Sequence, residues 1–177
     1  MQLNIREETQ ADHRKVEAVV RAAFENAEHT SGDEVGLVHR LRKSEAFVPA
    51  FSLVAEIGKE IVGHIMLTRL EIVGDDGAVH ESLSLAPVSV LPAYQRRGIG
   101  GKLIERVHAI AKQAGERSIV LVGHPTYYPR FGYQRASRWG LRATFTVPDE
   151  AFMAIELVPG GLNGARGVIR YPPEFGI

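Results

Sequence analysis

Apolar residues recur every three or four positions in three segments of the chain, which predicts three amphipathic helices. The segments are Val16–Phe24, Val35–Leu41 and Ile99–Ala111. Asp33 stands where a carboxylate favours the start of the second helix, and Gly115 can end the third. Each predicted helix therefore has one apolar face to bury against other elements of the fold.

Between these helices the pattern changes to the short apolar runs of β-strands. Strands are predicted at Leu3–Ile5, Phe51–Ile57, Ile61–Val73, Ser82–Val90 and Ser118–Val122. The second and third are separated by a short turn and form a hairpin. Pro87 interrupts the fourth strand and removes one donor from its ladder, so we expect this strand to bulge or splay there.

The C-terminal third has a weaker pattern. It predicts a strand after Gly132, a strand at Leu141–Val147, a short helix at Pro148–Leu157 and a last strand at Val168–Tyr171. The order of elements favours an α+β (mixed α/β) fold with one main sheet flanked by helices. A chain of 177 residues is expected to form one domain, residues 1–177.

The composition limits the classes of partner and chemistry. The 21 basic and 21 acidic side chains cancel, so no global field attracts nucleic acid or an anionic membrane. Because the chain has no cysteine, thiolate chemistry and sulfur-rich zinc sites are excluded, and the seven histidines lack metal-binding spacing; we expect no metal. No run of residues is apolar enough for a signal peptide or a membrane span, so we expect a cytoplasmic protein.

The segment Gln95–Gly101 carries the clearest chemical signal. It joins a predicted strand to the start of a long helix, where backbone N–H groups are unpaired and the helix dipole is positive. Its glycines would let a phosphate approach the backbone, and Arg96, Arg97 and Lys102 add positive charge. A turn with exposed arginines is the structural alternative.

Two common nucleotide sites do not fit this loop. A Walker loop requires a lysine followed by serine or threonine after its last glycine, and that arrangement does not occur. The dinucleotide fingerprint requires a third glycine at position 103, which is Leu103 here. The loop therefore predicts a different phosphate-bearing ligand.

The stretch from Val88 to Gly100 resembles the motif A of the GNAT superfamily of N-acetyltransferases. Its Q/R-x-x-G-x-G/A core falls on Gln95, Gly98 and Gly100. The segment Tyr128–Tyr133 is similar to the closing motif of that family, and the string from His124 to Tyr133 resembles the YhbS-like branch of predicted acetyltransferases. The resemblance implies a splayed central sheet, a core of about residues 3–134 and a C-terminal strand extension of about residues 139–177.

The resemblance implies acetyl-CoA as the co-substrate. The backbone of Arg96–Gly101 would hold its pyrophosphate, and the pantetheine arm would run beside the strand Val88–Val90. The implied cofactor-binding residues are Val88, Ser89, Val90, Gln95, Arg96, Arg97, Gly98, Ile99, Gly100, Gly101 and Lys102. Tyr128 matches the tyrosine that serves the family as general acid, and its neighbour Tyr127 is the alternative.

The general base stays open. The family often carries a glutamate on the strand before the loop, but no acid stands between Ser82 and Val90. His124, His64, Glu81 and a water relay are the candidates, with His124 preferred because it follows the strand across the predicted splay. A histidine on the third helix, His108, is expected to be exposed.

The sequence thus predicts an acetyl-CoA-dependent N-acetyltransferase acting on a primary amine. A non-catalytic acyl-CoA sensor and a transferase of longer acyl groups are the alternatives. The expected partner is a small-molecule or peptide amine, with nucleic acid and membrane disfavoured, and the protein is expected to be a monomer or a homodimer. The acceptor itself has no recognisable sequence code.

Overall fold

The computed structural model describes residues 2–27 and 30–177. Its helices are α1 (His13–Phe24), α2 (Glu34–Arg42) and α3 (Ile99–Gln113). Its strands are β1 (Leu3–Glu7), β2 (Phe47–Ile57), β3 (Glu60–Gly74), β4 (Val79–Val90), β5 (Ser118–Val122), β6 (Gln134–Arg135), β7 (Leu141–Arg142), β8 (Phe152–Glu156) and β9 (Gly167–Arg170). The three predicted helices and the strands before residue 123 are confirmed, with β2 and β4 starting earlier than predicted.

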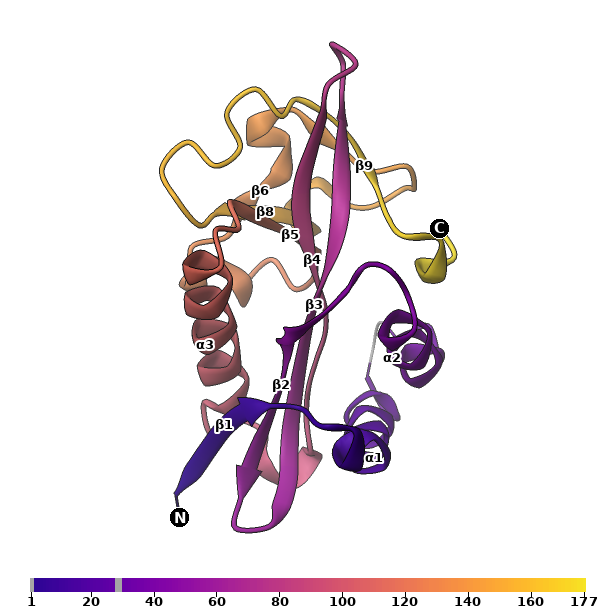
Figure 1. The fold of residues 1–177 in the computed structure, drawn as a ribbon, viewed down its shortest axis with the longest axis vertical. Helices are drawn as coiled ribbons and strands as arrows, with labels where there is room; N and C mark the ends of the chain where they lie inside the picture. Colours follow the sequence, from indigo (N-terminus) through magenta and orange to yellow (C-terminus); the bar gives the residue numbers. More distant parts are fainter. Residues whose placement is uncertain (1, 28–29) are drawn as a thin grey trace.

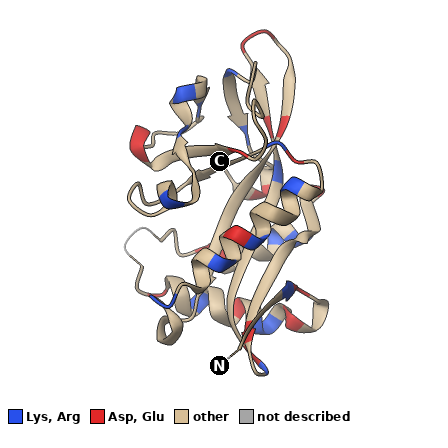
Figure 2. Cartoon of the chain, turned by 90° about the vertical axis from the view of Figure 1, so that its left-hand side faces the viewer, with Lys and Arg blue, Asp and Glu red and all other residues tan. Residues whose placement is uncertain are grey.

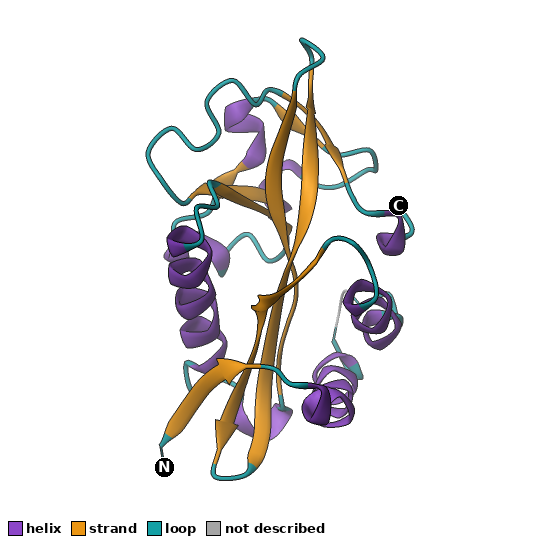
Figure 3. Cartoon of the chain, in the orientation of Figure 1, coloured by secondary structure: helices purple, strands orange, loops and turns teal. Residues whose placement is uncertain are grey.

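The strands of the described residues form one mixed sheet with helices on both faces, as the sequence predicted. Its main order is β1-β2-β3-β4-β5-β8-β6, with β9 paired to β3 and β7 paired to β9. Helix α3 covers one face, and α1 and α2 cover the other (Figure 1, Figure 3). The long β3–β4 hairpin runs the length of the molecule between these layers (Figure 1).

Each face of the sheet has its own hydrophobic core. On the α3 side, Leu103, Ile104 and Val107 are fully buried against β2, β3 and β4. On the other side, Val16 and Leu41 pack from α1 and α2 against the sheet. The charged residues of α3 are exposed, and Figure 2 shows where Lys, Arg, Asp and Glu fall along the helices. The predicted amphipathic pattern therefore places the helices as expected.

The C-terminal segment differs from the prediction. The helix predicted at Pro148–Leu157 is wrong: a 3-10 turn at Asp149–Ala151 is followed by strand β8. β8 pairs antiparallel with β5 at one edge and with β6 at the other, and its first three residues, Phe152–Ala154, are buried. The strand predicted at Leu141–Val147 shortens to the two residues of β7. The extension thus completes the sheet.

Candidate active site

The sheet opens between β4 and β5. These parallel strands pair only at Leu83–Ile119 and Ser84–Val120, before the irregularity at Pro87. There the Ala86–Pro87 peptide is cis and the β3–β4 register shifts. The splay that Pro87 predicted in this strand is therefore confirmed, and β4 has a free edge beyond it.

The backbone at this free edge offers hydrogen-bonding groups. The N–H of Leu91 donates to the carbonyl of Val62 on β3 at 2.8 Å. Since residues of an antiparallel strand face their partner strand alternately, the polar groups of Val88 and Val90 point to the open side. The side-chain amide of Gln95 donates to the Val90 carbonyl at 3.0 Å. Gln95 therefore ties the loop to the free edge.

The loop between β4 and α3 is shaped to present its amides. Gly98 precedes the first turn of α3 with a φ of 80°, in the left-handed region that glycine adopts readily. Arg96 also has a positive φ, 64°, which is uncommon for a residue with a side chain. Successive residues of alternating handedness form a concave array of N–H groups that suits an anion. The loop thus has the geometry of a phosphate cradle.

The free edge and the cradle line one cleft of about 1040 Å³. This volume lies near the upper end of those of small-molecule sites. The predicted site residues that line it are Val88, Val90, Gln95, Arg96, Gly98–Lys102, His124 and Tyr128. Tyr94, Glu105, Tyr127, Arg130 and Phe131 line it as well, and of these only Tyr127 was considered from the sequence.

Two predicted binding residues lie elsewhere. The side chain of Ser89 is buried on the α1–α2 face of the sheet, opposite His64 in the β3–β4 pairing. The guanidinium of Arg97 stacks on the ring of Tyr94, 5.3 Å from its centroid, beside the cleft rather than in its lining. The alternation that turns the backbone of Val88 and Val90 to the open side turns the backbone of Ser89 toward β3, so neither its side chain nor its backbone polar groups face the cleft.

The two sequence motifs are in direct contact. A Cβ added to Gly100 would lie 3.2 Å from the Tyr127 hydroxyl, and one added to Gly101 would lie 3.2 Å from the Phe131 ring. Gly100 leaves room for Tyr127, which precedes the short helix η3 (Tyr128–Phe131), and Gly101 leaves room for Phe131, the last residue of that helix. Both also leave room for a ligand.

Tyr128 is held deep in the cleft wall. Its ring is 9% exposed and packs edge-on against Tyr127 and Tyr133, with centroid distances of 5.1 and 5.8 Å. A Cβ on Gly123 would come within 2.4 Å of the ring, so glycine at that position is required for this placement. Burial, and to a lesser degree Tyr127, raises the pKa of Tyr128 well above its usual value. The phenol is therefore a protonated donor at neutral pH.

The candidate bases occupy different environments. His124 has an exposed side chain and lines the cleft, two residues beyond β5. Glu81 lies on β4 opposite Glu71. It precedes the residues of β4 that pair with β5, on the side of Pro87 away from the free edge, and it does not line the cleft. His64 is fully buried on the α1–α2 face, where Ser52 Oγ lies 3.1 Å from its Nε2. Of these three residues, His124 is the one in the cleft.

Burial changes the expected behaviour of two histidines. It lowers the pKa of His64 to about 4, although the nearby carboxylate of Glu8 acts in the opposite direction. The prediction that His108 is exposed is wrong: it is half-buried, and its Nε2 lies 2.9 Å from the hydroxyl of Tyr133. Desolvation lowers the pKa of His108 to about 4 as well. Both side chains are therefore neutral at pH 7.

Within residues 2–27 and 30–177, no cluster of three or more potential ligands could hold a metal ion. In the same residues, no helix is both long and apolar enough to cross a membrane.

Comparison with known proteins identifies the family. Residues 4–136 match the model of the acetyltransferase (GNAT) domain. The chain is 38% identical over 120 residues to the uncharacterised N-acetyltransferase YjhQ of Escherichia coli, covering 66% of this chain and 65% of that protein. It is 26% identical over 171 residues to the uncharacterised N-acetyltransferase YhbS of the same organism, covering 97% of each.

Solved structures agree with this match. The CoA complex of YhbS from Escherichia coli superposes with a TM-score of 0.89 at 26% identity, covering 100% of this chain and 93% of that one. A GNAT family acetyltransferase from Brucella melitensis in complex with acetyl-CoA superposes with a TM-score of 0.81 at 33% identity, covering 98% of both. The chain belongs to the GNAT family of acetyltransferases.

Proposed function

We propose that the protein transfers an acetyl group from acetyl-CoA to a primary amine of a small molecule or peptide. The observation that carries this proposal is the single cleft that joins the phosphate cradle to the free edge of β4. The related proteins from Escherichia coli and Brucella melitensis were solved with CoA and acetyl-CoA, which supports the same donor here.

The cleft offers a matching group for each part of the donor. The amides of residues 96–101 and the charges of Arg96 and Lys102 suit the pyrophosphate. The outward-facing backbone of Val88 and Val90 suits the amides of the pantetheine arm, which would pair with β4 as an added strand. The thioester would then lie in the splay, near Tyr128.

The residues at that end can support acyl transfer. The amine nitrogen attacks the thioester carbon, the C–N bond forms, and the C–S bond breaks. An N–H of Val88 or Val90 would stabilise the negative charge that develops on the carbonyl oxygen. Tyr128, whose phenol is protonated at neutral pH, would donate its proton to the leaving thiolate of CoA.

The attacking amine must lose a proton, and we propose His124 as the group that accepts it. Its support is its position in the cleft lining, across the splay from β4. A water relay is the competing possibility. Removing the imidazole with His124→Gln separates the two, because a relay through water alone would leave the rate and its pH dependence unchanged.

The C-terminal extension is included in this functional unit. We propose that residues 1–177 act as one domain, because β8 pairs with β5 beside the splay and β9 pairs with β3. A chain ending near residue 136 would leave the edge of β5 uncovered. It is therefore expected to lose both stability and donor binding.

Release of free CoA thiol from acetyl-CoA, measured across a panel of amines, tests the reaction. Turnover with at least one amine is expected, reduced at least tenfold in Tyr128→Phe. Unchanged turnover in that variant would remove Tyr128 as the acid. Tight CoA binding with no turnover of any amine would favour the non-catalytic sensor. Titrations with acetyl-, propionyl- and succinyl-CoA would reveal a preference for a longer acyl group.

A further inference from the structure

Tyr127 reaches across the cleft from the β5 side to the start of α3. Its hydroxyl lies 3.2 Å from the point where Gly100 would carry a Cβ, and Val90 Cγ2 lies 3.8 Å from the same point. Gly100 belongs to the first turn of α3, and Val90 is the last residue of β4. The phenol oxygen is therefore at the junction of the phosphate cradle and the free edge.

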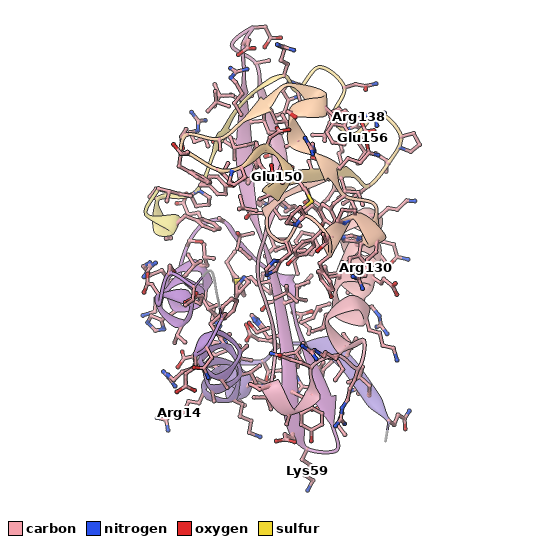
Figure 4. All side chains as sticks on the ribbon, turned by 180° about the vertical axis from the view of Figure 1, so that it is seen from behind. Arg14, Lys59, Arg130, Arg138, Glu150 and Glu156 are labelled. Atoms are coloured by element: carbon pink, nitrogen blue, oxygen red, sulfur yellow. The ribbon has the colours of Figure 1, made fainter. Side chains whose placement is uncertain are left out.

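Arg130 fixes the orientation of this tyrosine. Its guanidinium stacks over the Tyr127 ring, 4.7 Å from the centroid, and its Nε donates to the Tyr127 carbonyl at 3.0 Å. Arg130 lines the same cleft as Arg96 and Lys102, which come from the opposite wall. Figure 4 shows Arg130 beside α3. The cleft is thus bordered by positive charge on both sides.

The neighbouring tyrosine is in a different position. The Tyr128 ring packs on Gly123 and against the buried Tyr133, and no atom of it lies within 4 Å of the Cβ position of Gly100. Tyr127 is only half-buried and packs edge-on against Phe131, at 5.3 Å between centroids. Two adjacent tyrosines therefore reach different parts of one cleft, which indicates different roles.

We propose that Tyr127 and Arg130 form a clamp on the pyrophosphate of the acyl donor, opposite the amides of α3. The Tyr127 hydroxyl would donate a hydrogen bond to a phosphate oxygen, and Arg130 would supply charge to the same group. Desolvation raises the pKa of Tyr127, so the hydroxyl keeps the proton that this bond requires. The inference rests on the proposed function, since it assumes that CoA occupies the cleft.

Calorimetric titration of CoA into the wild type, Tyr127→Phe and Arg130→Gln tests the clamp without an acceptor. Tyr127→Phe keeps the ring and its stacking with Arg130, so it removes only the hydroxyl. A hydrogen bond to a charged group is worth roughly 1.5–3 kcal/mol, so the dissociation constant should rise roughly 10- to 100-fold. Arg130→Gln should weaken binding at least about tenfold and make it less sensitive to salt.

Titration with dephospho-CoA identifies the phosphate involved. This ligand keeps the pyrophosphate but lacks the 3′-phosphate. Each substitution should therefore raise the dissociation constant of dephospho-CoA by the same factor as that of CoA. If the loss in Arg130→Gln disappears with dephospho-CoA, the arginine binds the 3′-phosphate and the proposal is wrong for that residue. The same result for Tyr127→Phe would remove the tyrosine from the clamp.

Matched variants control for nonspecific effects. Arg138 stacks on Trp139, 5.8 Å from the ring centroid, and lies nearer the C-terminal strands than Arg130 (Figure 4). Tyr171 is half-buried, packs against Phe145 and Phe175, and does not line the cleft. Arg138→Gln and Tyr171→Phe should bind CoA like the wild type. A wild type that does not bind CoA would contradict the proposed function itself, whereas equal binding by wild type and Tyr127→Phe would contradict only the clamp.

Discussion

Gly123 holds Tyr128 in position because it has no side chain. The ideal Cβ of an alanine there would lie 2.4 Å from Tyr128 Cε2 and 2.9 Å from Cδ2. Ordinary carbon–carbon contacts are about 3.5–4.0 Å, so Gly123→Ala must push the ring by about 1 Å. Gly123 does not have a positive φ, so backbone strain does not contribute to this effect.

The displacement should reduce both stability and turnover. Overpacking of this kind costs about 1–3 kcal/mol, which lowers the Tm of a domain of this size by about 2–12 °C. A catalytic group misplaced by about 1 Å can cost about a hundredfold in rate. We therefore expect Gly123→Ala to reduce thiol release nearly as strongly as Tyr128→Phe, while still binding CoA.

A double-variant cycle isolates the contact between the two residues. In a Tyr128→Ala background the ring is absent, so adding Gly123→Ala should cost almost nothing in chemical denaturation. If Gly123→Ala destabilises the protein equally with and without the Tyr128 ring, the contact with that ring is not the reason that position 123 requires glycine. The reasoning would also fail if the single variant kept the full Tm and the full rate.

Three further predictions concern stability and binding. Because His64 and His108 have folded pKa values of about 4 against 6.5 when unfolded, their stabilising effect is present above pH 6.5. The free energy of unfolding should fall as the pH falls toward 4, by up to about 1.4 kcal/mol per pH unit for each histidine. In denaturation curves measured over a series of pH values, His64→Gln should remove the contribution of one histidine. Glu8→Gln leaves the buried Arg42 without its bidentate partner and should lower the free energy of unfolding by about 3–5 kcal/mol. Arg170→Gln breaks an exposed ion pair with Glu71 and should lower it by about 1 kcal/mol or less. Equal losses in the two variants would contradict the argument from burial. CoA affinity should fall as salt rises from 0.05 to 0.5 M, about the range over which exposed charges become screened, and a salt-independent affinity would contradict a phosphate site.

The sequence predicted the helices well because each has one apolar face. It failed at Pro148–Leu157, where a proline and acidic residues resemble a helix start. Here a short, mostly buried apolar run forms a strand that is paired at both edges, with β5 and with β6, and such a run cannot be told from a buried helix by periodicity alone. Pairing with a strand that lies about thirty residues earlier in the chain determines its structure.

The candidate site was predictable where it depends on local sequence. The loop geometry at Gly98 and the splay at Pro87 both follow from residue type. The contact of Tyr127 with Gly100 was not predictable, because it joins residues that come together only through tertiary packing. The same holds for Arg130, whose role depends on its stacking over the neighbouring ring. The sequence around Tyr127, five residues before Gly132, gives no signal of which wall of the cleft its ring reaches.

The most direct test of the account is a crystal structure of the protein with acetyl-CoA. We predict the pyrophosphate on the amides of residues 96–101, the pantetheine arm along the free edge at Val88 and Val90, and the thioester sulfur within hydrogen-bonding reach of the Tyr128 hydroxyl. A pyrophosphate bound away from the start of α3, or a thioester remote from Tyr128, would contradict the account.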